Sequence, residues 1–227
     1  MNGSSLLGRF LRCERGGPLV EATVMMPLLF VFLLGSVDFL NGLYQYNAAA
    51  KAVQMGARLA AVSDPVATGL NNLCSNGSAC STPGGAMPNF TVTCSGGSAT
   101  CTCTGTCTGV GNAPALSTAA LRTIVFGRSN GGTCGTPTGR YTMGMCHMFP
   151  GLAVNNVVVT YRQTGLGYDG RPGGPVPTVS VSLQNLTFSF YFLGALSGFA
   201  NIQIPGLATT VTGEALSSSA QCFTGPC

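Results

Sequence analysis

Apolar residues are distributed unevenly along this chain, and the longest apolar run lies near its amino terminus. No residue from Ala22 to Val37 is charged, Asp38 interrupts the run, and residues 39–50 are again uncharged. Because a helix needs about 20 predominantly apolar residues to cross a bilayer, residues 22–44 predict a membrane span. Small residues at helical spacing extend the pattern up to Ala61. A stop is favoured by the proline that follows Asp64, so we predict one long helix over residues 17–62.

The carboxy-terminal half has a different periodicity. Apolar residues at helical spacing within residues 114–128, followed by the stop signal Gly127, predict a short helix. The β-branched run at residues 157–161 and the alternation at residues 179–183 are typical of strands, and residues 205–214 are a candidate for another. Together these elements predict an α+β fold, with a long and a short helix against a small antiparallel sheet.

The alternation changes parity after residue 183. Apolar residues occupy odd positions before Gln184-Asn185 and even positions after it. A strand cannot keep one face buried across such a switch, which predicts a bulge or a turn there. Beyond the switch, Phe188, Phe190 and Phe192 are expected to belong to the core.

Residues 64–112 are rich in Gly, Ser, Thr and Cys, and within them residues 91–111 offer almost no side chains for a core. We expect a surface loop in which cross-links replace burial. Ten of the eleven cysteines follow the apolar run, and an even number on one side of a membrane segment favours disulfides in an oxidising compartment. These disulfide candidates are Cys74, Cys80, Cys94, Cys101, Cys103, Cys107, Cys134, Cys146, Cys222 and Cys227.

The spacing of the cysteines leaves their pairing open, with two exceptions. Cys101 and Cys103 are too close in sequence to suit bridge geometry, so we expect them to have different partners. For Cys222 and Cys227, the hypothesis is a bridge that closes a small carboxy-terminal loop.

Charge is sparse and is concentrated at the amino terminus. Charged residues make up 7% of the chain, against about 25% in a typical soluble domain. Arg9, Arg12 and Arg15 precede the span, and no comparable basic cluster follows. The positive-inside rule therefore places the amino terminus in the cytoplasm, and nucleic acid is not an expected partner.

Cleavage of the apolar run as a secretory signal is the alternative to a membrane anchor. An ordinary signal has an apolar core of about 7–15 residues followed by a small-residue cleavage site. Here the run is longer, and Ala48, Ala49 and Ala50 come only after a polar stretch. The pattern therefore favours a retained anchor.

Several spaced features occur together in the string RGGPLVEATVMMPLLFVFLLGSVDFL, followed by YNAAAKAVQMGARLAAV: Gly16, Glu21, Pro27, Asp38 and Gly56-Ala57-Arg58. Over about residues 12–62 the chain resembles the TadE-like pseudopilins, or minor pilins, of bacterial tight-adherence (Flp-type) pili. That family has Gly before a cleavage site, Glu at the fifth mature position, Pro six residues later, an acidic residue late in the span and a closing GAR. The strings NVVVTY, LGYDG and PVPTVSVSLQNLTF look like its carboxy-terminal part, whereas Ala22 stands where the family usually has an aromatic residue.

The resemblance implies that a prepilin peptidase removes the leader, residues 1–16, with the cut after Gly16 or after Gly17. Glu21 would then be recognised in processing and would pair with the new amino-terminal amine of a neighbouring subunit. Pro27 and Asp38 are further candidates for helix contacts during assembly.

The resemblance also implies a location and partners. The protein would cross the bacterial inner membrane once, with residues 63–227 forming a periplasmic, disulfide-rich domain, and incorporation into the fibre stays open. Its partners would be the major Flp pilin, a second pseudopilin and the inner-membrane assembly platform.

Each of these helix residues also has a simpler interpretation. Glu21 is a first-turn acid favoured by the helix dipole. Pro27 is a membrane proline whose freed carbonyl is satisfied by neighbours. Asp38 lies at the outer membrane interface without a partner helix.

No metal, cofactor or catalytic site is expected. Cys101, Cys103 and Cys107 are close together, but structural zinc sites usually have two paired C-x2–4-C motifs. The one histidine, His147, is expected to be structural, and the sequence has no nucleophile elbow, Walker A motif or Rossmann fingerprint. We therefore predict that the protein is not an enzyme.

The leading hypothesis is a minor pilin or pseudopilin that aids assembly, initiation or tip formation of a tight-adherence pilus. One alternative is a membrane-tethered or pilus-tip adhesin head that binds a surface ligand. Another is a secreted, disulfide-rich protein with a cleaved signal.

Overall fold

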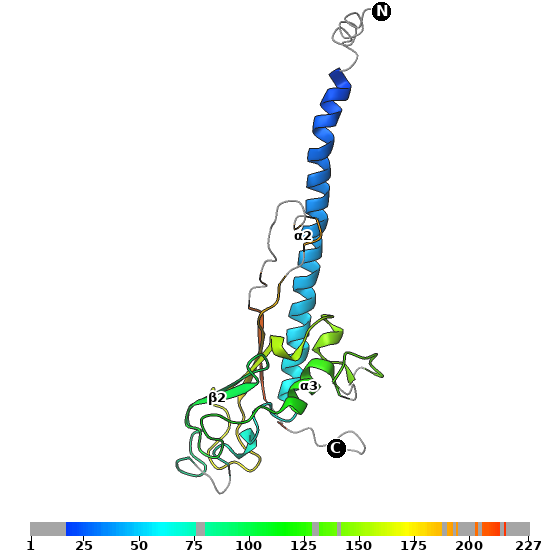
Figure 1. The fold of residues 1–227 in the computed structure, drawn as a ribbon. Coiled ribbons are helices and arrows are strands. Elements are labelled where there is room, and N and C mark those ends of the chain that lie inside the picture. Colours follow the sequence, from blue (N-terminus) through cyan, green and yellow to red (C-terminus); the bar gives the residue numbers. More distant parts are fainter. Residues whose placement is uncertain are drawn as a thin grey trace, which may run out of the picture. The chain divides into compact units, whose positions relative to one another are not determined.

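The structure is a computed structural model (Figure 1). It describes residues 17–75, 80–128, 132–139, 142–187, 190–192, 194, 203, 206–213 and 216. The chain divides into two compact units, one of residues 1–44 with 188–202 and the other of residues 45–187 with 203–227. The predicted site residues Gly16, Cys222 and Cys227 lie outside the described residues.

The long amino-terminal helix is present as predicted. Helix α2 (Gly17–Ala61) is one continuous α-helix (Figure 1). It contains Pro27 and has 45 residues, which corresponds to about 67 Å at 1.5 Å per residue. It ends one residue before the predicted boundary, in front of the Ser63-Asp64-Pro65 stop signal.

The strands form one antiparallel sheet in the order β2-β1-β3-β4-β5. Their bounds are β1 (Phe90–Ser95), β2 (Thr100–Gly105), β3 (Val157–Arg162), β4 (Thr178–Leu183) and β5 (Ala208–Thr212). The predicted strands at 157–161 and 179–183 and the candidate within 205–214 correspond to β3, β4 and β5. The α+β fold with a small antiparallel sheet is therefore confirmed.

The surface loop predicted at residues 91–111 is wrong for most of that stretch, because Phe90–Ser95 and Thr100–Gly105 form the β1–β2 hairpin. In β1, Phe90, Val92 and Cys94 point into the core, and in β2 Cys101 and Cys103 do the same. Disulfide-bonded cysteines act here as small apolar side chains, while the threonines between them suit a pleated, half-buried surface. The expectation that cross-links support this region is confirmed.

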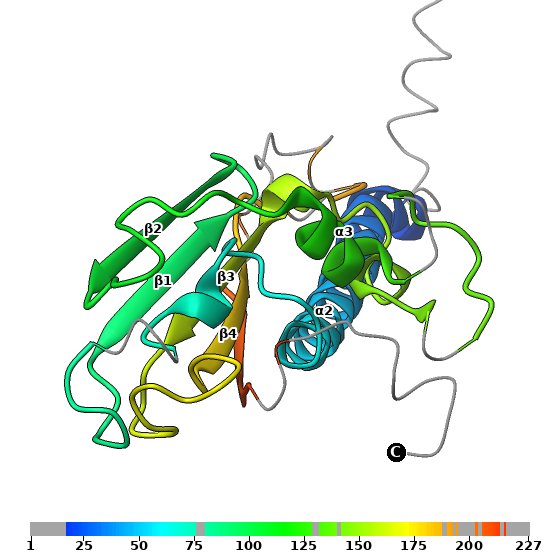
Figure 2. The same cartoon turned by 90° about the horizontal axis from the view of Figure 1, so that it is seen from below.

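The core lies between the inner face of the sheet and helices on that side. Figure 2 shows α3 (Thr118–Phe126) and the carboxy-terminal half of α2 together beside the sheet. Val92, Tyr161 and Val179 are cross-strand neighbours and are fully buried. Against them pack small residues of α2, including Ala49, Ala52, Val53, Ala57 and Ala60.

The unit of residues 45–187 and 203–227, called the sheet unit below, includes the carboxy-terminal part of α2. Close approach of this part of the helix to the rest of the sheet unit depends on small side chains. Met145 occupies the space that a Cβ atom of Gly56 would fill. The hydroxyl of Tyr161 accepts a hydrogen bond of 2.9 Å from the backbone N–H of Val66, and burial raises the pKa of Tyr161. The small residues predicted on this helix face therefore meet the chain's own domain.

The short helix is shorter than the predicted range 114–128. The side chain of Ser117 caps its amino terminus by accepting from the N–H of Ala120, and Gly127, with φ of 88°, ends it. Three 3-10 turns complete the described helices: η2 (Leu70–Asn72), η4 (Met145–His147) and η5 (Val154–Asn156).

The parity switch marks the end of β4, as predicted. The strand stops at Leu183, and Asn185 adopts a left-handed conformation with φ of 54°. The expectation that the following phenylalanines belong to the core is wrong for Phe192, which is 42% exposed, while Phe190 is half-buried. Phe188 lies outside the described residues. Among the described residues that follow β4, Thr187 forms an isolated antiparallel bridge with Gln203.

Candidate membrane helix and its supporting domain

The amino-terminal half of α2 presents large apolar side chains on all sides. Between Leu19 and Leu43 the large apolar residues that are exposed range from 37% for Leu34 to 74% for Phe32. Leaving such a side chain in water forgoes about 1.5–3 kcal/mol relative to burial. By length and composition, α2 is the one helix in the described part of the chain that meets the requirements of a membrane span.

Glu21 is the fifth residue of α2 and is exposed. The first helical turn, as described from Gly17, contains no acidic residue. The helix dipole favours an acid mainly within the first turn, and Glu21 is four residues after the first described residue of α2. The sequence places an exposed carboxylate at the entrance of the apolar stretch.

Pro27 lies inside the continuous helix. It has no N–H, so the carbonyl of Thr23 lacks its usual intrahelical donor. The nearby hydroxyl of Thr23 does not donate to this carbonyl, because it donates to the carbonyl of Val20 at 2.8 Å.

Asp38 is 1% exposed although it belongs to the apolar half of the helix. Its two carboxylate oxygens accept hydrogen bonds from the backbone N–H groups of Tyr191, at 3.0 Å, and Phe192, at 2.9 Å. A buried carboxylate requires such donors, because burial of an unpaired charge is costly. The sequence singled out Asp38 but gave no sign of these partners, which lie 153 and 154 residues away along the chain.

Eight of the ten predicted cysteines form four disulfides, and all are local in sequence. The pairs are Cys74–Cys80, Cys94–Cys101, Cys103–Cys107 and Cys134–Cys146. The expectation that Cys101 and Cys103 have different partners is confirmed. The hypothesis of a Cys222–Cys227 bridge falls outside the described residues.

In the described residues, two clusters contain side chains of the kinds that bind metal ions. One consists of Cys134, Cys146 and His147, and the other of Cys74, Cys80 and Asp169. In both clusters the two cysteines are joined to each other, so neither offers the thiolate that binds metal.

The ring of His147 is held by backbone groups. Its Nδ1 accepts from the N–H of Gly144 at 3.0 Å, and its Nε2 lies 2.8 Å from the carbonyl of Gly135. These contacts link two parts of the loop that the Cys134–Cys146 bridge also closes.

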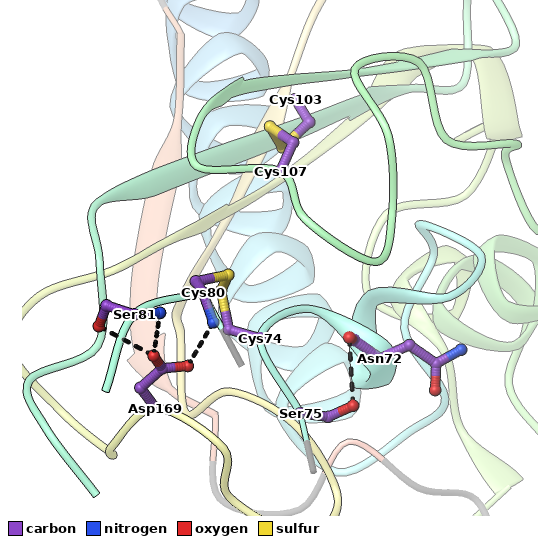
Figure 3. The surroundings of a disulfide bond; sticks show 8 residues. All are labelled: Asn72, Cys74, Ser75, Cys80, Ser81, Cys103, Cys107 and Asp169. Carbon is purple, nitrogen blue, oxygen red and sulfur yellow. Dashed lines mark hydrogen bonds between the residues drawn. A yellow bond between two sulfur atoms is a disulfide. The ribbon is translucent and has the colours of Figure 1, made fainter. Parts of the chain in front are cut away.

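Asp169 anchors the disulfide loop that Cys74 and Cys80 close, as Figure 3 shows. Its carboxylate accepts from the backbone N–H of Cys80 at 2.9 Å, and from both the N–H and the hydroxyl of Ser81. These hydrogen bonds, with that of Cys80 first, lower the pKa of Asp169. Next to it, the N–H of Gly170 donates to the carbonyl of Cys74. The Asp-Gly pair in LGYDG was the available signal in the sequence, although by itself it indicates only a turn.

The outer face of the sheet carries hydroxyl groups in register. One row crosses all five strands through Thr102, Thr93, Thr160, Ser180 and Thr210. The oxygen atoms of Thr93 and Thr160 are 3.4 Å apart, and Thr210 donates to Ser180. Neighbouring strands lie about 4.8 Å apart, so the row is a regular, uncharged array. This row is not evident from the sequence alone, because it depends on the strand register.

Comparison with known proteins gives a family match for the long helix but not for the sheet. The model of the family described as TadE-like protein matches residues 19–58. This confirms the resemblance drawn from Glu21, Pro27, Asp38 and Gly56-Ala57-Arg58, all of which lie in the matched segment. The match ends before the carboxy-terminal strings that also looked like the family. No match was found among curated proteins or among solved structures.

Proposed function

We propose that this protein is a minor pilin or pseudopilin that takes part in assembly, initiation or tip formation of a tight-adherence pilus. The observation that carries the proposal is the TadE-like match over residues 19–58 on a helix whose amino-terminal half exposes large apolar side chains. A membrane span that continues into the core helix of a folded domain suits a subunit that is stored in the membrane before assembly. The role is structural and not catalytic.

The family resemblance supports a topology and a set of partners. The leader faces the cytoplasm, and the disulfide-bonded domain faces the periplasm, where disulfides persist. A prepilin peptidase cuts after Gly16 or Gly17, and assembly then involves the major Flp pilin, a second pseudopilin and the inner-membrane platform. Glu21 pairs with the amino-terminal amine of a neighbouring subunit, because a charge in hydrocarbon requires a partner.

A charge-removing substitution at Glu21 tests this role. We expect Glu21→Gln to leave the protein in the membrane but to reduce pilus number strongly, as counted by electron microscopy in cells that lack the native protein. Glu14→Gln is the matched control, because it removes the same charge from the leader and leaves the mature chain unchanged. Normal piliation with Glu21→Gln would contradict the assembly role of this carboxylate.

The hydroxyl row favours a second function, adhesion to a neutral carbohydrate surface. The row offers hydroxyl donors and acceptors without charge, which suits recognition of other hydroxyl groups. Thr102→Glu and Thr210→Glu place charges on its exposed ends, where surface substitutions usually change stability by only about 0.5 kcal/mol. Thr68→Glu, at an exposed position outside the sheet, is the control.

The outcomes for adhesion are distinct from those for assembly. An adhesin predicts normal pili and weaker binding of the Thr102→Glu and Thr210→Glu cells to immobilised neutral polysaccharide, with no change for Thr68→Glu. Equal binding by all three variants would exclude this use of the row. Deletion of the gene separates the two functions further, since loss of pili supports assembly and intact pili with lost attachment support adhesion.

A further inference from the structure

The contact between Asp38 and residues 191–192 has a consequence for how the protein meets the membrane. Asp38 is the seventeenth residue after Glu21, which is a rise of about 25 Å along the helix. The hydrocarbon core of a bilayer is about 30 Å thick. When Glu21 lies at the cytoplasmic boundary, Asp38 is therefore inside the distal edge of the hydrocarbon.

A carboxylate at that depth requires donors, and the chain supplies two of them. The N–H groups of Tyr191 and Phe192 lie within 3.0 Å of the two carboxylate oxygens, and Asp38 is 1% exposed. These hydrogen bonds satisfy the carboxylate and the two backbone N–H groups together, because unpaired N–H groups are also costly in hydrocarbon. Asp38 therefore holds a non-helical piece of backbone against the apolar half of α2.

The side chains around these two amides suit lipid. Tyr191 is 67% exposed and Phe192 is 42% exposed, and they belong to the same compact unit as the apolar half of α2. No residue from Pro172 to Gly213 is charged. Exposed aromatic residues next to a membrane span are typical of the interface, where their rings lie at headgroup level.

We propose that Phe190–Phe192 forms a second membrane contact, in which the rings of Tyr191 and Phe192 lie in the distal leaflet beside α2 and Asp38 holds their backbone. The occupant of this surface is lipid, at the boundary between headgroups and acyl chains. The continuity with the apolar face of α2 supports it. The proposal rests on the proposed membrane insertion of α2, and the experiment below separates the two.

The chain contains no tryptophan, so a single introduced tryptophan reports on its own position. Phe192→Trp is prepared in the full chain and reconstituted into phosphatidylcholine–phosphatidylglycerol vesicles with or without brominated acyl chains. Bromine quenches indole fluorescence only at close range. We expect a roughly twofold loss of indole fluorescence with lipids brominated near the headgroup and a smaller loss with lipids brominated near the chain end, as fits an interfacial ring.

Two further single-tryptophan proteins serve as references. Phe30→Trp, midway between Glu21 and Asp38, reports insertion of α2 and is expected to be quenched most by bromine near the chain end. Tyr168→Trp, 46% exposed in the sheet unit next to Asp169, is expected to stay unquenched. If Phe30→Trp is quenched and Phe192→Trp is not, the second contact is wrong and insertion stands. If neither is quenched, insertion itself is wrong.

The role of Asp38 is tested by adding a second substitution to these reporter proteins. Asp38→Leu removes both acceptor oxygens, and we expect it to weaken quenching of Phe192→Trp while quenching of Phe30→Trp is unchanged. Asp38→Asn keeps one acceptor oxygen and should give an intermediate value. Unchanged quenching of Phe192→Trp when Asp38→Leu is added would overturn the positioning role. A blue-shifted indole at position 192 that bromine does not reach would indicate a protein occupant instead and would overturn the lipid contact.

Discussion

The two halves of α2 make opposite use of the same helical backbone. The amino-terminal half carries Leu, Phe, Val and Met, and exposes them, as Phe32 at 74% illustrates. The carboxy-terminal half carries mainly small residues and buries them, as Ala52 and Ala57 at 0% illustrate. Large apolar residues thus face outward in the segment that is long and apolar enough to cross a membrane, and small ones face inward where the helix approaches its own sheet. Side-chain size and exposure together indicate that the first half suits lipid and the second half suits a protein core.

Reduction of the disulfides should give the largest difference between the two halves, because it should destabilise the sheet unit and leave the amino-terminal half of α2 unaffected. The sheet unit holds all four described bridges, and each typically contributes about 2 kcal/mol or more. We expect dithiothreitol to abolish protection of the sheet unit against protease while the protein stays in the carbonate-washed membrane pellet. Unchanged protease resistance after complete reduction would show that the bridges do not support the domain.

A charge in the middle of the amino-terminal half should affect only membrane retention. On insertion scales, replacing an apolar residue by arginine at the helix centre costs about 3 kcal/mol. Phe30→Arg is therefore expected to move protein from the membrane pellet to the soluble fraction, and Phe30→Leu is not. Equal retention of both variants would argue against a span centred near residue 30.

A larger side chain in the carboxy-terminal half should affect only the domain. Ala57 is fully buried, and overpacking of a core typically costs about 1–3 kcal/mol. Ala57→Leu should lower the urea midpoint of the sheet unit, whereas Phe32→Leu in the other half should not. The same midpoint for both variants would mean that the second half of α2 is not part of the core.

The smallest expected effect is the pH dependence of the sheet unit. Hydrogen bonds hold the pKa of Asp169 below its usual value, so its contribution is complete above the unfolded-state pKa of about 3.9. As pH falls through the lower folded-state pKa, protonation removes that contribution. We expect thermal stability to decline below about pH 4 and to decline less steeply in Asp169→Asn. Identical pH profiles would exclude Asp169 as a source of the acid sensitivity.

The helix and its carboxy-terminal end were predictable from the sequence, because its apolar length and its Asp64-Pro65 stop are local signals. The same holds for β3 and β4, whose β-branched alternation is local. Strands β1 and β2 were missed, since their burial depends on Cys94 and Cys101 facing each other across the hairpin, and a Thr-Cys repeat without that register looks like a loop.

Long-range partners were the least predictable part of the site. The two backbone donors to Asp38 come from residues 191–192, and no local pattern links them to the helix. Likewise, Asp169 and the Cys80–Ser81 backbone meet only in the folded domain. A sequence indicates that a buried carboxylate needs a partner, but the fold decides which backbone supplies it.

Amino-terminal sequencing of the protein extracted from membranes tests the central claim most directly, because processing and retention of α2 define a pilin-like subunit. We predict that the mature chain begins at Gly17, or at Pro18 if the cut follows Gly17, with Glu21 near its start. A chain that begins at Met1, or one that begins after Ala50, would contradict the account.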